Sequence, residues 1–272
     1  MVQLSVIMGV YNIEHLDIFD AAIGSILGQS EPNFELIICD DGSTDQTPQI
    51  IERYAEMDPR ICVIHNESNM GLAATLNRCI FVAQGEYIAR QDADDLSNVK
   101  RFEKQLKFLK ENPDVSFVGS NIILVDGHRD WGERCFPEFP ERKDFLFTQP
   151  FVHGALMFRR SCLEQVGYYR VSKETRRTED YDLLMRIYAQ GMRGANLQEM
   201  LYKFMENPAA MRRRKYRYRI DEAIVRWKGF CALGLMPYGI PYVVKPMIVG
   251  LIPKNLLLGL KEGRTMRRLQ EK

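Results

Sequence analysis

The chain has 272 residues, which corresponds to about 1.8 domains at roughly 150 residues per domain. Its hydrophobic content of 46% and aromatic content of 10% are typical of a globular protein and exclude a disordered or fibrous one. The net charge of +1 conceals a division, because residues 1–204 carry 22 basic and 31 acidic side chains, whereas residues 205–272 carry 15 and 5 and form a basic extension.

Short apolar runs alternate with helical patterns through the first 110 residues. The runs have the length and composition of buried strands and fall at residues 4–10, 34–39, 61–64 and 87–89. Each is followed by apolar residues at helical spacing. Thr47 and Pro48 are predicted to cap and start the second helix, and Gly85 to close the third. Four consecutive strand and helix pairs predict an α/β fold with a mostly parallel sheet covered on both faces.

The pattern changes beyond residue 115. Residues 115–125 are rich in strand-forming side chains, Asp126 and Gly127 give a hairpin turn signal, and residues 155–158 predict another short strand. We therefore expect a mixed second half with antiparallel edges. The remaining features are a helix that contains Leu183, Leu184 and Ile187 and stops near Gly191, a basic segment over 212–219, and a proline-interrupted apolar segment over 235–260.

Acidic residues follow two of the predicted strands. The second strand ends in CDDGSTD (39–45) and the fourth in RQDADD (90–95). Ligands bind beyond the carboxyl ends of the strands in an open parallel sheet, and carboxylates there suit Mg²⁺ or Mn²⁺ bound together with substrate phosphates. A turn with capping side chains explains the first cluster equally well. The first strand ends in GVYN (9–12) rather than GxGxxG, which argues against a nicotinamide enzyme.

Six motifs follow one another along the chain: SVIMGVYN, ELIICDDGSTD, NMGLAATLN, GEYIARQDADD, HGALMFRR and TEDYDLLMR. Together, over about residues 3–205, they resemble glycosyltransferase family 2, the inverting enzymes of hexosyltransferase type with the GT-A, Rossmann-like fold. Within that family the chain looks most like bacterial enzymes of capsule, O-antigen or exopolysaccharide synthesis. The resemblance implies a GT-A domain over 1–204, with a nucleotide-binding half (1–115) and an acceptor-binding half (116–204), and a helical C-terminal extension over 205–272.

The resemblance also implies a donor site. Val10 and Tyr11 would line the nucleobase pocket, and Asp41 would accept a hydrogen bond from the uracil of a UDP-linked sugar. Many relatives carry a histidine in the segment that corresponds to residues 204–211, whereas this chain has FMENPAAM there. Three nearby cations are candidates to contact the donor phosphates in its place: Arg212, Arg213 and Arg214.

The same resemblance assigns the metal site and the catalytic base. Asp92 and Asp94 would form the DxD pair that binds Mg²⁺ or Mn²⁺, with Asp94 nearest the metal and Asp92 toward the ribose or the metal. Asp95 is an additional candidate because it continues the acidic run. Asp180 matches the base of the family. The chemistry requires such groups, since a divalent ion neutralises the departing diphosphate and a carboxylate must accept the proton of the attacking hydroxyl.

Two further residues in the motifs have alternative interpretations. His153 begins a strand-like run and either binds the acceptor or caps a loop, and single histidines are more often structural. Glu179 either belongs to the site or shapes the start of its helix, where acidic side chains are favourable. Both are secondary candidates for contact with the acceptor.

The basic extension has competing explanations as well. Residues 212–219 hold six basic side chains in eight, which fits a solvated face, a diphosphate clamp or contact with anionic lipid. The acidic remainder of the chain argues against nucleic acid as a partner. The apolar residues from Val243 to Leu258 are interrupted by prolines and lysines, which fits either a segment in the membrane interface or a tail packed on the domain.

The expected location is the cytoplasm or, through peripheral contact, the inner face of the cell membrane. No basic segment precedes an apolar stretch at the N-terminus, no 18 apolar residues run uninterrupted, and the six cysteines lack the spacing of a zinc site or disulfide framework. The expected partners are a nucleotide-sugar donor and a saccharide or polyprenyl-linked saccharide acceptor.

Two other functions are compatible with part of this sequence. Nucleotidyl or phosphoryl transfer also uses acidic metal sites on α/β sheets, but the chain has no GxxxxGK[ST] motif and no glycine-rich loop after the first strand. A non-catalytic membrane scaffold built around the basic extension is the second alternative.

Overall fold

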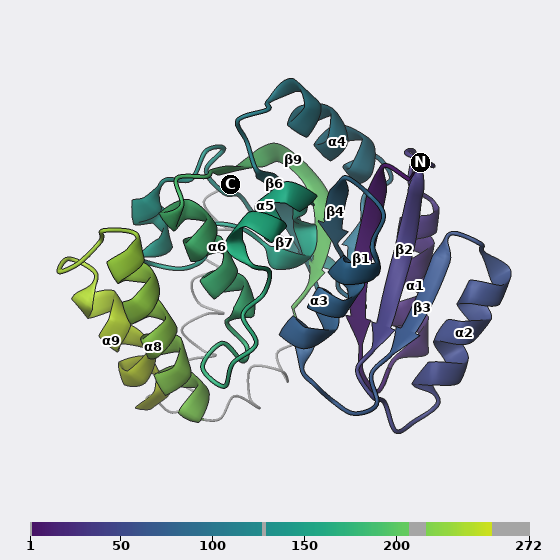
Figure 1. Cartoon of the computed structure of the whole chain (residues 1–272), viewed down its shortest axis with the longest axis horizontal. Helices are drawn as coiled ribbons and strands as arrows, with labels where there is room; N and C mark the ends of the chain where they lie inside the picture. The colour runs from purple at the N-terminus through teal and green to yellow at the C-terminus, as the bar shows by residue number, and fades with distance from the viewer. Residues whose placement is uncertain (1, 127–128, 207–215, 252–272) are drawn as a thin grey trace.

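The computed structural model describes residues 2–126, 129–206 and 216–251 (Figure 1). In this part of the chain, nine strands form one sheet in the order β3-β2-β1-β4-β8-β6-β9-β5, with β7 paired to β6. Strands β3, β2, β1 and β4 are parallel, β6 and β9 run in the same direction as these four, and β8, β5 and β7 run opposite. The predicted α/β fold with a mostly parallel sheet is confirmed.

The first half of the chain consists of the four predicted strand and helix pairs. Its elements are β1 (Leu4–Val10), α1 (Leu16–Leu27), β2 (Phe34–Asp40), α2 (Thr47–Met57), β3 (Ile61–His65), α3 (Leu72–Val82), β4 (Tyr87–Arg90), β5 (Leu96–Ser97) and α4 (Arg101–Glu111). Alternate side chains of β1 enter two different hydrophobic clusters. Ile7 packs with α3, whereas Val6 and Met8 pack with α1 and α4. Helices therefore cover both faces of the sheet, as the continuous apolar strands predict.

The second half mixes strand directions. Its elements are β6 (Phe117–Val125), β7 (Asp130–Arg134), the 3-10 turns η1 (Arg142–Phe145) and η2 (His153–Ala155), β8 (Met157–Arg159), α5 (Arg160–Val166), α6 (Glu179–Ala189) and β9 (Gly194–Met205). The antiparallel pairing of β6 with β7 confirms the predicted hairpin, although Gly127 lies outside the described residues. Antiparallel pairing is not confined to the edges, because β8 lies inside the sheet between β4 and β6.

Two predicted helix boundaries are wrong, each because a tertiary contact uses the residue. Helix α2 begins at Thr47 itself, and the Thr47 hydroxyl accepts a hydrogen bond from the backbone N–H of Ile13 at 2.8 Å instead of capping its own helix. Helix α3 ends at Val82, before Gly85. A Cβ atom on Gly85 would lie 2.6 Å from the backbone nitrogen of Ser5, so this glycine allows close approach to β1.

The described part of the C-terminal extension packs against α6. It forms a hairpin of two helices, α8 (Arg217–Ala232) and α9 (Ile240–Leu251), and Figure 1 shows α8 beside α6. Phe230 and Val243 are buried in the same cluster as Leu184 of α6. In the ranges that the structure describes, no helix has both the length and the apolar character that crossing a bilayer requires.

Candidate active site

The carboxylate of Asp41, directly after β2, is held by three hydrogen bonds. It accepts from the backbone N–H groups of Met70 at 2.8 Å and Gly71 at 2.9 Å, and from the Asn66 side-chain amide at 2.8 Å. These bonds fix the loop before α3 against the end of β2. A carboxylate has about four acceptor positions, and these bonds use three of them. The proposed contact of Asp41 with uracil stays a prediction.

Turn chemistry accounts for part of the first acidic cluster. The Asp40 carboxylate accepts from the backbone N–H of Ser43 at 3.1 Å, and Asp45 accepts from that of Thr47 at 2.9 Å. Ser43 in turn accepts from the N–H of Asn12, which joins this turn to the end of β1. The turn interpretation therefore holds for Asp40 and Asp45, while Asp41 bonds to a different loop.

The two residues predicted to line the nucleobase pocket lie at the same edge. Val10 is 4% exposed, and its carbonyl accepts from the N–H of Asp41 at 2.8 Å. Tyr11 is 49% exposed and presents an aromatic ring to solvent beside that junction. A rigid backbone with one exposed ring is suited to stacking against a planar group.

The second acidic cluster follows β4, and its three carboxylates have different surroundings. Asp92 is paired with the buried guanidinium of Arg90, and its side chain is 30% exposed. Asp94 is exposed, yet the surrounding protein, followed by the charge of Asp92, raises its pKa to about 6. Asp95 is 1% exposed and accepts from the backbone N–H of Met205 at 2.6 Å. Burial, then the charges of Asp92 and Asp94, raise the pKa of Asp95 well above its usual value.

The donor set of this cluster fits Mg²⁺ or Mn²⁺. Asp92 and Asp94 supply hard carboxylate oxygens, and repulsion between them is the kind of cost that a divalent cation relieves. Across the described residues, no three His, Cys, Asp or Glu side chains are grouped as a complete metal site. Mg²⁺ typically completes its coordination with water and substrate phosphate, so binding by Asp92 and Asp94 stays a prediction. The buried contact of Asp95 with β9 favours a structural role for that residue.

Two buried arginines that the sequence analysis did not single out support this loop. Arg90 is 1% exposed and reaches the carbonyl of Gln91 as well as Asp92. Arg101 is fully buried and donates to Gln91 Oε1 and Ser97 Oγ at 2.9 Å and to the Arg90 carbonyl at 2.8 Å. A sequence signal existed for Arg101, because it and Gln105 lie one turn apart on the face of α4 that also carries buried apolar residues.

Asp180 lies in the first turn of α6, where its carboxylate accepts from the backbone N–H of Tyr181 at 2.7 Å. Burial raises the pKa of Asp180, and the charge of Asp92 acts in the same direction. Burial also raises the pKa of the Tyr169 hydroxyl, and the charges of Asp180, Glu179 and Asp92 add to this effect. The carboxylates that follow β4 and those that begin α6 therefore lie close enough to interact, although about 85 residues separate them along the chain.

His153 bonds to a tyrosine beside these carboxylates. Its Nε2 lies 2.7 Å from the Tyr169 hydroxyl, and burial together with the charge of Arg90 holds the pKa of His153 well below its usual value. The imidazole is therefore neutral at physiological pH. This contact favours a role in shaping the loop, while contact of His153 with an acceptor stays a prediction.

Glu179 is 8% exposed, and burial, followed by the charge of Asp180, raises its pKa to about 7. The folded chain thus holds a proton on Glu179 that the unfolded chain releases above about pH 4.5. The contribution of protonated Glu179 to the free energy of unfolding is complete below pH 4.5 and is lost as the pH rises to 7. Between those values, we expect the free energy of unfolding to fall by on the order of 2 to 3 kcal/mol more in the wild type than in Glu179→Gln.

Urea unfolding of both chains at pH 4.5, 6 and 8 measures this difference. Asp94 and Asp180 also have raised pKa values, so the wild type alone would not isolate Glu179, whereas the difference between the two chains does. Identical pH dependence in both would contradict the assignment.

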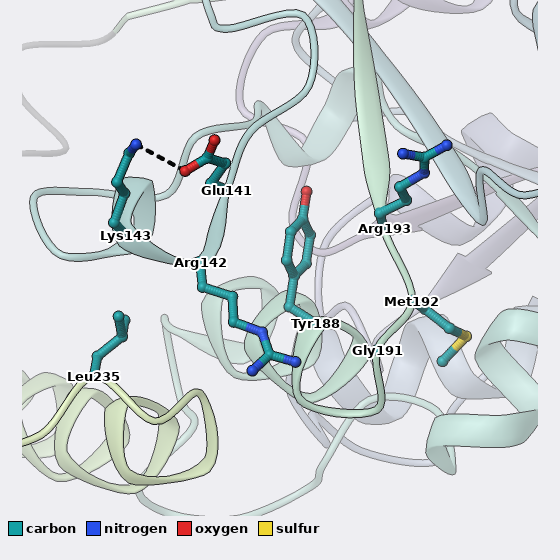
Figure 2. Close-up of a pocket in the computed structure, with 8 residues that line it drawn as sticks. All are labelled: Glu141, Arg142, Lys143, Tyr188, Gly191, Met192, Arg193 and Leu235. Atoms are coloured by element: carbon teal, nitrogen blue, oxygen red, sulfur yellow. Dashed lines mark ion pairs between the residues drawn. The ribbon is translucent and has the colours of Figure 1, made fainter.

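Two pockets in the described part of the surface lie away from these carboxylates. Figure 2 shows one of about 490 Å³ beside η1 and α6, where Lys143 pairs with Glu141 and Arg142 and Arg193 extend from either side of Tyr188. Another, of about 740 Å³, includes Gln3 and Gly85 at the opposite, amino-terminal edge of the strands. Neither contains the acidic residues that the predicted chemistry needs. Arg212, Arg213 and Arg214 lie outside the described residues.

Solved structures similar to this chain define its fold. The crystal structure of S. aureus TarS 1-349 in complex with UDP-GlcNAc matches 82% of this chain and 65% of its own, with a TM-score of 0.67 and 22% identity. A longer TarS structure is matched over 39% of its length. Mannosyltransferase PcManGT from Pyrobaculum calidifontis, in complex with GDP-Man and Mn2+, matches 97% of this chain and 80% of its own, with a TM-score of 0.60 and 20% identity. At these identities the likeness establishes the fold, which is GT-A.

Sequence comparisons establish the family. The model of glycosyl transferase family 2 matches residues 5–167. EpsE of Bacillus subtilis (strain 168), named as a glycosyltransferase, is 41% identical over 98% of this chain and 95% of its own. O-antigen biosynthesis glycosyltransferase WbnJ of Escherichia coli is 32% identical over 74% of this chain and 79% of its own. The chain belongs to glycosyl transferase family 2 and is a glycosyltransferase, which confirms the resemblance seen in its motifs.

Proposed function

We propose that this enzyme moves a sugar from a UDP-linked donor to a saccharide acceptor in surface polysaccharide synthesis, with inversion at the anomeric carbon. WbnJ is named for O-antigen biosynthesis, AmsE of Erwinia amylovora, 27% identical, is named for amylovoran biosynthesis, and TarS was crystallised with UDP-GlcNAc. The observation that carries the proposal is that Asp92 and the start of α6 lie around one buried pair: Gly154 packs against Asp92, the adjacent His153 bonds to Tyr169, and the charges of Asp180 and Asp92 both act on the pKa of Tyr169. Transfer requires a base near the group that holds the donor diphosphate.

Asp180 is the proposed base. The acceptor hydroxyl donates a hydrogen bond to this carboxylate and transfers its proton as the oxygen attacks the anomeric carbon. The backbone N–H of Tyr181 and the side chain of Gln149 both hydrogen-bond to this carboxylate and fix its direction. A raised pKa makes Asp180 a stronger proton acceptor than an exposed aspartate. A single displacement from the face opposite the leaving group inverts the anomeric centre, so an α-linked donor gives a β-linked product.

Asp92 and Asp94 are the proposed ligands of Mg²⁺ or Mn²⁺. When bound, the ion neutralises the charge of the departing nucleoside diphosphate. Arg90 holds one oxygen of Asp92, which fixes the direction of that carboxylate, while Asp94 is exposed and has no such clamp. We therefore propose that Asp94 lies nearest the metal ion and that Asp92 contacts either the ribose of the donor or the metal.

The remaining contacts complete the proposal. Tyr11 and Val10 would pack against the base of the nucleotide, and the carboxylate of Asp41 would meet uracil N–H. The acceptor is proposed to be a saccharide, carried on a polyprenyl lipid, at the inner face of the membrane. Residues 1–115 would bind the donor, 116–204 the acceptor, and the extension 205–272 the membrane surface.

Calorimetry with UDP tests this proposal directly. We expect binding in the presence of Mn²⁺ that weakens at least tenfold with EDTA, and a similar loss in Asp94→Asn with Mn²⁺ present. Asp45→Asn is the matched control, because its carboxylate belongs to the turn after β2 and bonds to Thr47. Equal UDP affinity in the wild type with Mn²⁺ and with EDTA would contradict the metal site, and absence of UDP binding in both would contradict the donor assignment.

A further inference from the structure

The α8–α9 hairpin exposes apolar side chains at helical spacing. On α8, Ile220 and Trp227 are 43% and 50% exposed and lie seven residues, or two turns, apart on one face. On α9, the exposed apolar residues follow at intervals of four, four and three and are Ile240, Val244, Ile248 and Leu251. Tyr238, between the helices, is 82% exposed. Other residues of the two helices, such as Phe230 and Val243, are buried in the core cluster, so the exposed stripes are apolar surface that this core does not cover.

The hairpin has no accessible acidic side chain, and the segments that flank it are basic. Helix α9 has no acidic residue, and the two of α8 are occupied internally, since Asp221 is buried and Glu222 pairs with Arg219 and Arg226. The chain on either side is basic in composition. Residues 207–215 carry four basic and no acidic side chains, and residues 252–272 carry six and two. An apolar face with basic neighbours and no accessible acid is complementary to an anionic lipid surface.

The hairpin contacts the loop before α6, the helix that carries Asp180. Lys228 pairs with Glu174 at 2.5 Å, and the guanidinium of Arg177 lies over the Tyr218 ring at 5.4 Å. Glu174 and Arg177 both belong to the loop that leads into α6. A surface bound by the hairpin would therefore have a fixed orientation relative to the start of α6.

We propose that the outer apolar faces of α8 and α9 dock into the headgroup region of an anionic bilayer. This inference deepens the membrane contact of the proposed function and rests on it for its purpose, but the binding itself does not require sugar transfer. A second copy of the chain fits less well, because pairing two such faces would bring like charges together. Trp227 and Tyr238 are of the residue types that favour the boundary between water and lipid.

Trp227 provides a direct reporter. The chain has two tryptophans, so Trp131→Phe leaves Trp227 as the only one. We expect its emission to shift to shorter wavelength, and the protein to sediment, with phosphatidylcholine vesicles that contain about 30% phosphatidylglycerol, and much less with phosphatidylcholine alone. Binding should weaken as salt is raised, because part of the attraction is electrostatic.

Charge placed in the apolar face should remove this binding. Ile220→Glu together with Ile248→Glu is expected to weaken vesicle binding at least tenfold while leaving UDP affinity with Mn²⁺ unchanged. The control is Met57→Glu. Met57 is 78% exposed, and its helix α2 lies at the far end of the molecule from α9 (Figure 1). This variant should bind vesicles like the wild type.

Three results would overturn the proposal. Wild-type protein could fail to bind anionic vesicles, or the double variant could bind as well as the Met57 control. Sedimentation could instead show a dimer that the double variant loses, which would make the face a contact between copies. Intact UDP binding alongside any of these results would leave the proposed function standing, so the two failures are distinguishable.

Discussion

Replacing Asp180 by Asn is expected to lower kcat by about 10²- to 10⁴-fold while leaving UDP affinity with Mn²⁺ within about twofold of the wild type. The amide keeps the size of the side chain and still accepts the hydrogen bond from Tyr181 N–H, but it cannot accept the proton of the acceptor hydroxyl. Release of free UDP from a UDP-sugar, measured with acceptor at saturation, gives the turnover. Calorimetry on the same sample gives the affinity.

Glu179→Gln is the matched control for this prediction. It makes the same chemical change one residue earlier in α6, at a carboxyl whose pKa of about 7 leaves it partly protonated at neutral pH. We expect a loss of less than tenfold. A larger loss in Glu179→Gln than in Asp180→Asn would transfer the role of base to Glu179, since a pKa near the working pH also suits that role. Unchanged turnover in both variants would contradict the proposed mechanism.

Gly154→Ala is expected to damage both stability and the metal site. A Cβ atom at this position would overlap the Tyr202 hydroxyl and lie 2.7 Å from an oxygen of Asp92. Tyr202 is 1% exposed on β9 and cannot turn away, and Asp92 is held by Arg90. Overpacking of this kind costs roughly 1 to 3 kcal/mol of unfolding free energy, which urea titration would measure. Displacement of Asp92 should also weaken UDP binding in Mn²⁺ by about tenfold.

Two variants separate these effects. Gly24→Ala in α1 has nothing within 4 Å of the new methyl group and should stabilise the chain by roughly 0.5 to 1 kcal/mol. Adding Tyr202→Phe to Gly154→Ala removes the overlapping hydroxyl, so stability should partly return while UDP binding remains weak through Asp92. Full recovery of UDP binding in the double variant would show that Gly154 acts through Tyr202 alone.

Much of the fold could be predicted from the sequence because the patterns that indicate it are local. Strand length, helical spacing and the alternation of strand with helix depend on neighbouring residues, and they predicted β1 to β4 and their helices within a few positions. The errors arose where a distant segment used the residue. Thr47 bonds to Ile13 instead of capping α2, and Gly85 lies against Ser5, so neither has the local role that its type suggests. The position of β8 inside the sheet was not predicted, for the same reason. The sequence of a strand of three residues does not indicate which strands it pairs with.

For the site, the sequence by itself determined which residue types were available and where they stood along the chain. The acidic run after β4, the acidic start of α6 and the order of the six motifs are sufficient to indicate the family. Only the tertiary structure decided what surrounds each carboxylate: Asp92 against Arg90, Asp95 buried beneath β9, and Asp180 within electrostatic reach of Asp92. The reason is physical, because the pKa and the accessibility of a carboxylate depend on burial and nearby charge, and both are set by segments far away in the sequence.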